Sequence, residues 1–538
     1  MASITIQLMD ATYFTNYSII NLLMNTLRAL FFLVILLLLP QITPAFPLSS
    51  TSQDFSNGTI AIHHAVPEVP RAGTDRFRVS VDGHPLGLYN DRSYWGGIVS
   101  FAQFEFTKGQ EVTIDIAYDK PIHSYEVLPK SLRLNSITQT SDTTLRIVTA
   151  VPDQHISIIP NEDPQQDVLH LFAQSIDPND PHIATGGYVR DEAHKLHYFG
   201  PGYYDLRPQL KDGTLNIESG WTVYLAAGAV VQGQLAASRC ENIKVLGRGM
   251  MFHTSKLMSM HIDISQHITV EGVLFFQNCA QMWQVPLWLC SDIDFRNVKI
   301  LCTHYASTDG LDIHYCQNGR FRNMFIRAND DCITVKGMDK SAPPSTRPAN
   351  SDLLFDRMQL WNDCNNAFTI GEESAASIYR NIRLTNSCIL HSYDDPNHHD
   401  DRRWCDSRAA WSIISLDGTY FQDILIDNLD VHYCQRLISI GFYDKFWNNP
   451  MGNQKWPGGI RGVTLRNITS YRQSTATCAN DIQISGWTAT ADTPAKWVDG
   501  VVLDNITIAG RKVKNLGCPY LRIGEKTKNI IVRKQQKK

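Results

Sequence analysis

The chain has 538 residues, 43% of them hydrophobic, and a formal net charge of −4 at pH 7. Its length leaves room for two or three domains, or for one long domain built of repeats. Nucleic-acid-binding proteins usually carry a basic surface, whereas this chain has only a short basic tail at 526–538. The composition therefore argues against a nucleic-acid partner.

The N-terminus carries the pattern of a secretory signal peptide. The apolar run 30–39 follows Arg28 and ends before the small residue Ala45, an order typical of such signals. The run is short for a membrane span. We expect residues 1–45 to be removed, with Met24 as an alternative start, and the mature protein to be secreted, extracellular and monomeric. A retained run would instead anchor the protein to a membrane.

Two further features fit a secreted protein. Sequons for N-glycosylation begin at Asn57, Asn467 and Asn505. None of the 12 cysteines precedes Cys240, so any disulfide bonds would join parts of the second half of the chain. The cysteine spacings do not match a zinc site, and several, such as Cys290, could instead be buried thiols.

The first segment after the signal, 46–170, is predicted to be a β-sandwich. Short strands of alternating hydrophobicity are separated by Gly, Asp and Pro, a pattern typical of this fold. These strands are expected at 77–81, 112–116, 145–148 and 156–159.

The remainder, 171–538, has a repeating pattern. Alternating strands begin at Ile243, Ile268 and Ile293, 25 residues apart. Similar strands recur at 321–324, 382–384, 424–428, 463–467 and 501–505. Repeats of this length without helical patterns indicate a solenoid whose coils bury one another. We predict an all-β protein, in which a right-handed parallel β-helix follows the N-terminal β-sandwich.

Three aspartates stand out in this repeat region. Asp309 and the pair Asp330-Asp331 each precede an alternating strand, and they are 21 residues apart, so stacked coils could bring them together on one outer face. Glycoside hydrolysis needs a protonated acid and a carboxylate that activates water, and clustered carboxylates raise one another's pKa. Aspartates in turns can also simply cap the backbone, and other pairs such as Asp394-Asp395 occur.

From 222–225 onwards the chain resembles the polygalacturonase-type β-helix glycosidases of glycoside hydrolase family 28. The resemblance is strongest at 308–313 and 330–333. It implies an inverting hydrolase with Asp330 as general acid and with Asp309 and Asp331 activating water. An inverting pair is expected to stand about 6.5–9.5 Å apart.

The chain departs from this family at three places. Ser307 stands where the family's Asn-Thr-Asp-Gly motif has its asparagine. Asn366 stands where the family has its active-site histidine, and 411–415 lacks the Arg-Ile-Lys that grips a uronate carboxylate. A carboxylate-binding site needs Arg or Lys, which Lys336, Arg402 or Arg403 could supply. A sandwich followed by a β-helix is also similar to the dextranase and isopullulanase group, which acts on neutral α-glucans.

Further residues are candidates for binding substrate. Asp312 and His314 share one strand face, Lys336 and Asn366 follow in the next repeats, and the loop residue Arg402 could join them. Tyr443 resembles a groove tyrosine of the family, although aromatic side chains are more often packing residues. Glu372 and Glu373 could face the groove, although a solvated turn is the more common place for such a pair.

A metal or a cofactor is not expected. The stretch 391–404 holds three histidines and four aspartates, but no predicted strand or helix there would fix metal ligands. The sequence thus predicts a secreted hydrolase of a pectin-type polysaccharide. The alternatives are a dextranase-like hydrolase of a neutral α-glucan and a non-catalytic carbohydrate-binding β-helix.

Overall fold

The computed structural model describes Phe46, 55–181, 183, 187–278, 281–393, 408–444, 453–472 and 481–533. The predicted signal segment 1–45 and the candidates Arg402 and Arg403 lie outside the described residues. No helix in the described ranges is long and apolar enough to cross a membrane.

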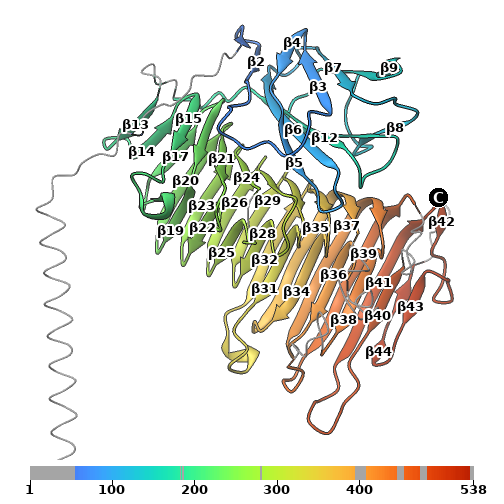
Figure 1. The fold of residues 1–538 in the computed structure, drawn as a ribbon. Helices are drawn as coiled ribbons and strands as arrows, with labels where there is room; N and C mark the ends of the chain where they lie inside the picture. Colours follow the sequence, from blue (N-terminus) through green and yellow to red (C-terminus); the bar gives the residue numbers. More distant parts are fainter. Residues whose placement is uncertain are drawn as a thin grey trace, which may run out of the picture. The chain divides into compact units, whose positions relative to one another are not determined.

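Two sheets form the N-terminal region of the described chain (Figure 1). Five strands form one of them: β3 (Phe77–Val81), β4 (His84–Leu86), β7 (Val112–Tyr118), β9 (Ser136–Ser141) and β10 (Thr144–Thr149). Seven form the other: β1 (Phe55–Ser56), β2 (Ile60–Ile62), β5 (Tyr89–Arg92), β6 (Ile98–Phe106), β8 (Tyr125–Leu128), β11 (Gln154–Pro160) and β12 (Val168–Ser175).

The two sheets share one apolar core, as expected of a sandwich. Strand β7 alternates buried and partly buried residues, so Ile114 and Ile116 point to one face. There they belong to the same cluster as Phe104 of β6 and Leu169 of β12. The predicted strands at 77–81, 112–116, 145–148 and 156–159 are all present.

The rest of the described chain winds into parallel strands that form two long sheets. One sheet has 11 strands: β16 (Thr214–Asn216), β19 (Gln234–Ser238), β22 (Met260–Asp263), β25 (Val285–Trp288), β28 (Leu311–His314), β31 (Ile333–Gly337), β34 (Phe368–Ser374), β36 (Trp411–Ser415), β38 (Ile438–Phe442), β40 (Ile482–Ser485) and β43 (Leu521–Ile523).

The other long sheet has 22 strands among the described residues. They are β13 (Tyr188–Asp191), β14 (Leu196–Phe199), β15 (Gly202–Asp205), β17 (Thr222–Leu225), β18 (Ala229–Gln232), β20 (Glu241–Gly247), β21 (Met250–His253), β23 (Gln266–Glu271), β24 (Leu274–Gln277), β26 (Ser291–Arg296), β27 (Lys299–Cys302), β29 (Gln317–Arg322), β30 (Phe325–Ala328), β32 (Asn350–Asp356), β33 (Gln359–Asn362), β35 (Ile378–Ser392), β37 (Tyr420–Cys434), β39 (Gly459–Ser470), β41 (Trp497–Ile508), β42 (Arg511–Lys512), β44 (Thr527–Lys528) and β45 (Ile531–Val532). Two 3₁₀ turns, η1 (Lys211–Gly213) and η2 (Pro344–Thr346), lie between strands.

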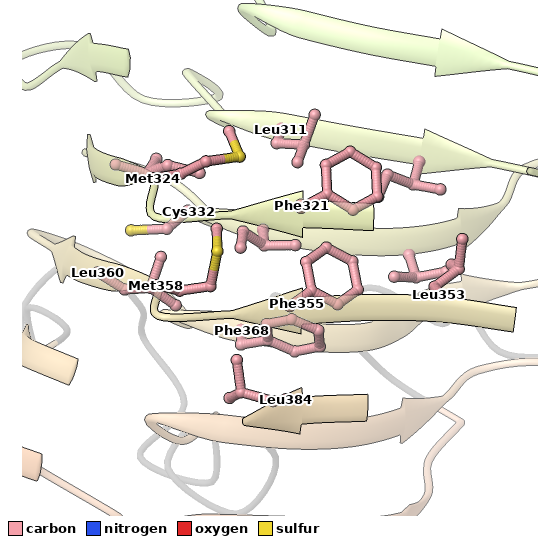
Figure 2. Packing of buried hydrophobic residues seen from close by; sticks show 14 of the residues in the cluster. Leu311, Phe321, Met324, Cys332, Leu353, Phe355, Met358, Leu360, Phe368 and Leu384 are labelled. Carbon is pink, nitrogen blue, oxygen red and sulfur yellow. The ribbon is translucent and has the colours of Figure 1, made fainter. Parts of the chain in front are cut away.

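Each coil places its apolar residues above those of the coil before it. Leu311 of β28 pairs with Ile333 of β31, which pairs with Phe368 of β34. Because side chains alternate along a strand, these residues all point inward. Figure 2 shows Leu311 and Phe368 packed with Phe321 and Phe355 from the other sheet. The predicted right-handed parallel β-helix is confirmed.

A ladder of turn residues runs along the outside of the β-helix, one from each coil. Its members have a positive φ, which asparagine tolerates better than most residues. Amide side chains join successive coils, as where Asn428 Nδ2 donates to Asn386 Oδ1 at 2.9 Å. We call this set the asparagine ladder: Asn297, Asn323, Arg357, Asn386, Asn428, Asn467 and Asn505.

Two of the three predicted glycosylation sites belong to this ladder. Asn505 Nδ2 donates to Asn467 Oδ1 at 2.8 Å, and Asn467 Nδ2 donates to Asp427 Oδ1 at 3.0 Å. Asn57 is exposed and accepts a hydrogen bond from the hydroxyl of Thr59 at 2.8 Å. Glycosylation stays a prediction at all three sites.

The expected disulfide bonds are not found in the part of the chain that the structure describes. Cys290, Cys302 and Cys332 are buried thiols, as the alternative prediction held. Cys290 Sγ donates to the Trp288 carbonyl at 3.3 Å, and Cys316 Sγ donates to that of His314 at 3.4 Å. Cys240, Cys388, Cys434 and Cys518 also form no disulfide bond.

The sandwich packs along the β-helix through a second apolar cluster. Phe101 and Phe172 belong to this cluster, where their rings contact Phe276 and Phe325, and a row of side chains from successive coils completes it. The row consists of Tyr203, Val230, Phe252, Phe276, Leu301, Phe325, Trp361, Leu390 and Tyr433. The fully buried Arg327 lies beside it, paired with Asp363 at 2.9 Å and hydrogen-bonded to the sandwich residue His170 at 3.0 Å.

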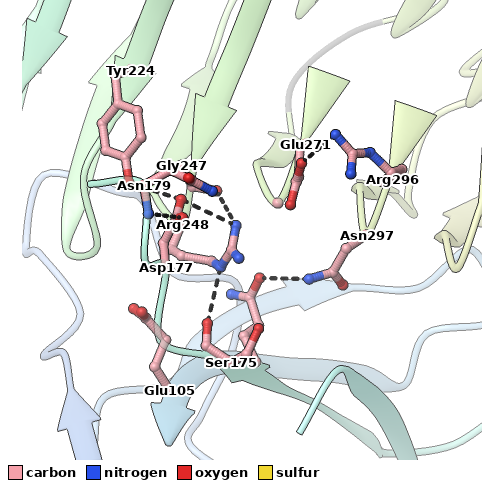
Figure 3. A network of polar contacts seen from close by, with 12 residues as sticks. Glu105, Ser175, Asp177, Asn179, Tyr224, Gly247, Arg248, Glu271, Arg296 and Asn297 are labelled. Atoms are coloured by element: carbon pink, nitrogen blue, oxygen red, sulfur yellow. Dashed lines mark hydrogen bonds and ion pairs between the residues drawn. The ribbon is translucent and has the colours of Figure 1, made fainter. Parts of the chain in front are cut away.

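A polar cavity of about 430 Å³ also lies between the sandwich and the β-helix. Arg248 donates to the carbonyls of Ser175 and Gly247, both at 3.2 Å, and Arg296 pairs with Glu271 at 2.8 Å (Figure 3). Its cationic side chains are therefore largely engaged by protein acceptors. The three candidate aspartates do not line this cavity.

Candidate active site

The structure brings the three aspartates together on the outer face of the 11-stranded sheet. Leu311 pairs with Ile333, so Asp309 and Asp331 occupy equivalent positions in adjacent coils. Carboxylate oxygens of Asp309, Asp330 and Asp331 lie within 4.8 Å of one another. We call these three residues the carboxylate cluster.

Gly310 allows the coils to come this close. Its N–H donates to the Asp331 carbonyl at 2.9 Å. A Cβ atom at this position would lie 2.5 Å from Ile326 Cγ2 and 2.6 Å from the Cys332 carbonyl oxygen. A larger residue would push apart the two turns that carry the aspartates.

Asp330 is the most exposed member of the cluster. It is 8% exposed, against 2% for each of its two neighbours. Its Oδ1 accepts from Asn365 Nδ2 at 2.6 Å and from the Asp331 N–H at 2.9 Å, and its Oδ2 accepts from the Ser307 N–H at 3.0 Å. Asp330 is thus held in one orientation at the solvent side of the cluster.

Lys336 supplies positive charge inside the site. Its Nζ lies 2.7 Å from Asp309 Oδ2 and 3.3 Å from Asp312 Oδ1. Burial raises the pKa of Asp309 to about 6, and Lys336 opposes that rise while Asp330 adds to it. Burial lowers the pKa of Lys336, but the two carboxylates outweigh it and raise the pKa well above its usual value.

Asp331 and Asn366 form the deepest part of the site. Burial, together with Asp330 and Asp309, raises the pKa of Asp331 well above its usual value. Its Oδ1 accepts from the Asn366 N–H at 3.1 Å and from Asn366 Nδ2 at 2.9 Å. Asn366 is completely buried, so in this structure it orients Asp331 and offers no surface to a substrate.

Asp312 and His314 were also expected to bind substrate, and both are completely buried. The His314 ring stacks on Trp288 at 3.8 Å between ring centres, with Trp283 at 5.5 Å. Burial lowers the pKa of His314 well below its usual value. Under these two tryptophans, His314 is a neutral supporting residue.

The sequence analysis missed both tryptophans. Trp288 pairs in register with His314, and Lys336 Nζ lies 4.9 Å from the ring centre of Trp283. Both rings are partly exposed beside the carboxylate cluster. Flat aromatic faces suit the apolar faces of sugar rings. The outward position of Trp288, one residue after the inward Leu287, was the available signal.

Glu372 is a fourth acidic residue of the site, and of the two places considered for it the solvated turn is wrong. It is 4% exposed and accepts from Asn366 Nδ2 at 3.2 Å. Burial and Asp331 raise its pKa, and the buried Arg408 opposes that rise. Strand β34 continues through this position to Ser374, which turns Glu372 into the site.

Tyr443 lies farther away. It follows β38, three strands along the sheet from β31, and its hydroxyl is 3.0 Å from Ser439 Oγ. Strands in a sheet are about 4.8 Å apart, so this residue stands several coils from the carboxylate cluster.

Comparisons with known proteins define the fold. No family model and no curated protein matches the sequence. Dex49A from Penicillium minioluteum is similar in structure, with a TM-score of 0.61 and 15% identity over 90% of this chain and 100% of that chain. An exopolygalacturonase from Thermotoga maritima has a TM-score of 0.39 and 13% identity over 62% of this chain and 84% of that chain.

Other similar solved structures include polygalacturonases, an α-1,3-glucanase and an alginate lyase. At these identities the likeness to Dex49A establishes the fold alone, and the weaker match carries no further argument.

Proposed function

We propose that the protein is a glycoside hydrolase that cleaves a polysaccharide by acid–base catalysis with inversion. Three carboxylates within 4.8 Å of one another, one of which reaches solvent, carry this proposal. Asp330 protonates the leaving glycosidic oxygen as the bond to the sugar breaks. Asp309, with Asp331, takes a proton from the water that attacks the opposite face.

The electrostatics support a division of roles within the cluster. An Asp309 with a pKa of about 6 is ionised at neutral pH and suited to act as a base. Burial, together with Asp330 and Asp309, raises the pKa of Asp331 well above its usual value. Asp330 is the member of the cluster that reaches solvent.

The carboxylates are closer than the sequence-based expectation of about 6.5–9.5 Å, and nearer to the ~5–5.5 Å of retaining enzymes. A retaining mechanism would require a carboxylate free to attack the sugar. Asp309 Oδ2 is held by Lys336 at 2.7 Å, and Asp331 Oδ1 receives two hydrogen bonds from Asn366. These contacts favour activation of water, and therefore inversion.

The charges of the site favour a neutral glycan over the pectin-type substrate first expected. Lys336 forms ion pairs with Asp309 and Asp312, and the positive charge of Arg408 acts to lower the pKa of Glu372. Within the described residues, the acidic side chains outnumber these two cations. A polyuronate would be repelled, whereas the rings of Trp283 and Trp288 suit neutral sugars.

Reducing-end release from dextran, pullulan, polygalacturonate and rhamnogalacturonan tests both proposals. We expect release from a neutral glucan, and release from polygalacturonate alone would overturn the substrate class. Release from none of the four would favour a non-catalytic carbohydrate-binding protein. NMR of the first product should show an inverted anomer, and a retained configuration would contradict the assigned roles.

We further propose that the protein is secreted after removal of 1–45. Phe46 would then be the first residue, and it is 4% exposed, with its ring 4.7 Å from that of Tyr188. N-terminal sequencing of secreted material should begin near Phe46. Recovery only in the membrane fraction, with 30–39 still present, would contradict this.

A further inference from the structure

Two exposed aromatic rings stand away from the carboxylate cluster, on strands β37 and β41. Tyr420 is 49% exposed and Trp497 is 43% exposed. Both are paired in register with Gly459 of the intervening strand β39. Figure 1 shows these three strands side by side in the C-terminal half of the β-helix.

Gly459 leaves a gap between the rings. Neighbouring strands are about 4.8 Å apart, so Tyr420 and Trp497 start about 10 Å from each other. The atoms nearest to a Cβ built at Gly459 would be the Trp497 carbonyl oxygen at 3.4 Å and two Tyr420 ring carbons at 3.9 Å. A cavity of about 230 Å³ is lined by these three residues and their neighbours.

The size of the gap matches one flat ring. Carbon atoms in contact are about 3.5–4.0 Å apart, so a pyranose between two aromatic faces needs about 7–8 Å. Lys526 and Lys528 lie over the Trp497 ring, 5.4 and 5.7 Å from its centre. Both lysines come from the coil after Trp497, and Lys528 also lines the cavity.

A polar row runs beside the aromatic row, two residues further along each strand and therefore on the same face. It consists of Gln422, Arg461, Asp499 and Lys528, paired in register. Asp499 lies 3.3 Å from Lys528 and accepts from Asn529 at 2.8 Å. No described residue is hydrogen-bonded to the side chain of Gln422. Donors and acceptors thus stand where the hydroxyl groups of a sugar in the gap would project.

We propose that Tyr420, Gly459 and Trp497 form a second carbohydrate-binding site, which holds one pyranose residue of a polysaccharide between the two rings. The ring faces contact the apolar C–H faces of the sugar, and the polar row binds its hydroxyl groups. The class of ligand rests on the proposed function. The site itself contains no catalytic group and would keep the enzyme on a polymer between cleavage events.

Affinity electrophoresis in native gels containing dextran or polygalacturonate tests this site. All variants carry Asp330→Asn, so that binding is measured without hydrolysis and does not depend on the proposed activity. In at least one of the two gels, Trp497→Ala and Tyr420→Ala should each weaken the retardation about tenfold, since an aromatic contact and its buried area are lost. Gly459→Val, which fills the gap and keeps both rings, should do the same.

Leu516→Ala is the matched control, because it removes an exposed apolar side chain (48% exposed) from another surface. It should bind as the parent does. Unchanged retardation of Trp497→Ala, Tyr420→Ala and Gly459→Val in both gels would overturn the second site. Loss with the two ring variants but not with Gly459→Val would also overturn it, because the sugar would then not lie in the gap.

Discussion

The carboxylate cluster and the asparagine ladder lie on the outside of the same solenoid, but they are built in opposite ways. In the ladder, most coils place asparagine at the same turn, and its amides bond from one coil to the next. In the site, register-equivalent positions change at every coil: Trp283, Asp309, Asp331, Asn366 and Ala409. Repetition stabilises the stack, and departure from repetition marks the site.

The largest expected effect is a loss of activity, which should follow from a change in the carboxylate cluster and not from one beside the asparagine ladder. Asp330→Asn keeps the size and most hydrogen bonds of the side chain but cannot supply the proton. General acid catalysis typically contributes about 10²–10⁴-fold, so the rate of reducing-end release should fall at least about 100-fold, with an unchanged melting temperature. Asp427→Asn, beside the ladder, is the control and should change the rate by less than about tenfold. Near-full activity of Asp330→Asn would refute its role as the acid.

Lys336→Met removes the cation that pairs with the buried Asp309 and Asp312, a charge that has no counterpart in the asparagine ladder. It leaves Asp309 and Asp312 buried without their cation, and removing one partner of a buried pair typically costs about 3–5 kcal/mol. Urea unfolding should show this loss. Lys244→Met, at an exposed position, should leave stability nearly unchanged. Equal stability of the two variants would mean that the buried aspartates are protonated and need no cation.

The pH dependence of the rate reports on Asp309. Its folded-state pKa is raised to about 6, so it loses its charge as the pH falls through 6. A base must be ionised, so kcat/KM should fall about tenfold per pH unit below this value. Because Lys336 opposes the rise in the pKa, Lys336→Met should move this limb to higher pH. A limb near pH 4 in the parent enzyme would contradict the raised pKa.

The smallest expected effect lies in the ladder. Asn428 has a φ of 60°, and a residue with a Cβ but no polar side chain strains this conformation by about 1–2 kcal/mol. Asn428→Ala should therefore lower the free energy of unfolding by about that amount, without changing kcat. Asn428→Gly should lose less, because glycine adopts positive φ freely. A larger loss for glycine than for alanine would show that backbone strain is not the main cost.

The sequence predicted the coils because inward and outward residues alternate locally. It also singled out Asp309, Asp330 and Asp331, whose separation is one coil. Trp283 and Trp288 were missed, and Glu372 was left between the groove and a solvated turn, because the places of these residues depend on which residues pair between coils. Spacing alone cannot show which tryptophan covers His314, or that β34 runs on to Ser374.

The orientation of the thiols is a second feature that the sequence left open between disulfide bonds and buried thiols. Alternation does not reveal whether a cysteine at a turn points out toward a partner or back into the core. Cys290 and Cys316 point inward, where each thiol donates to the carbonyl two residues earlier.

The sandwich also has a consequence for how the protein unfolds. A solenoid is nearly one-dimensional, since each coil contacts only its neighbours, and such a stack can fray from its ends. The row from Tyr203 to Tyr433 takes side chains from successive coils and joins them in one apolar cluster with sandwich residues such as Phe101 and Phe172. Opening any of these coils exposes part of this shared surface. The coils that carry the carboxylates should therefore open together, as one cooperative unit, and not one at a time.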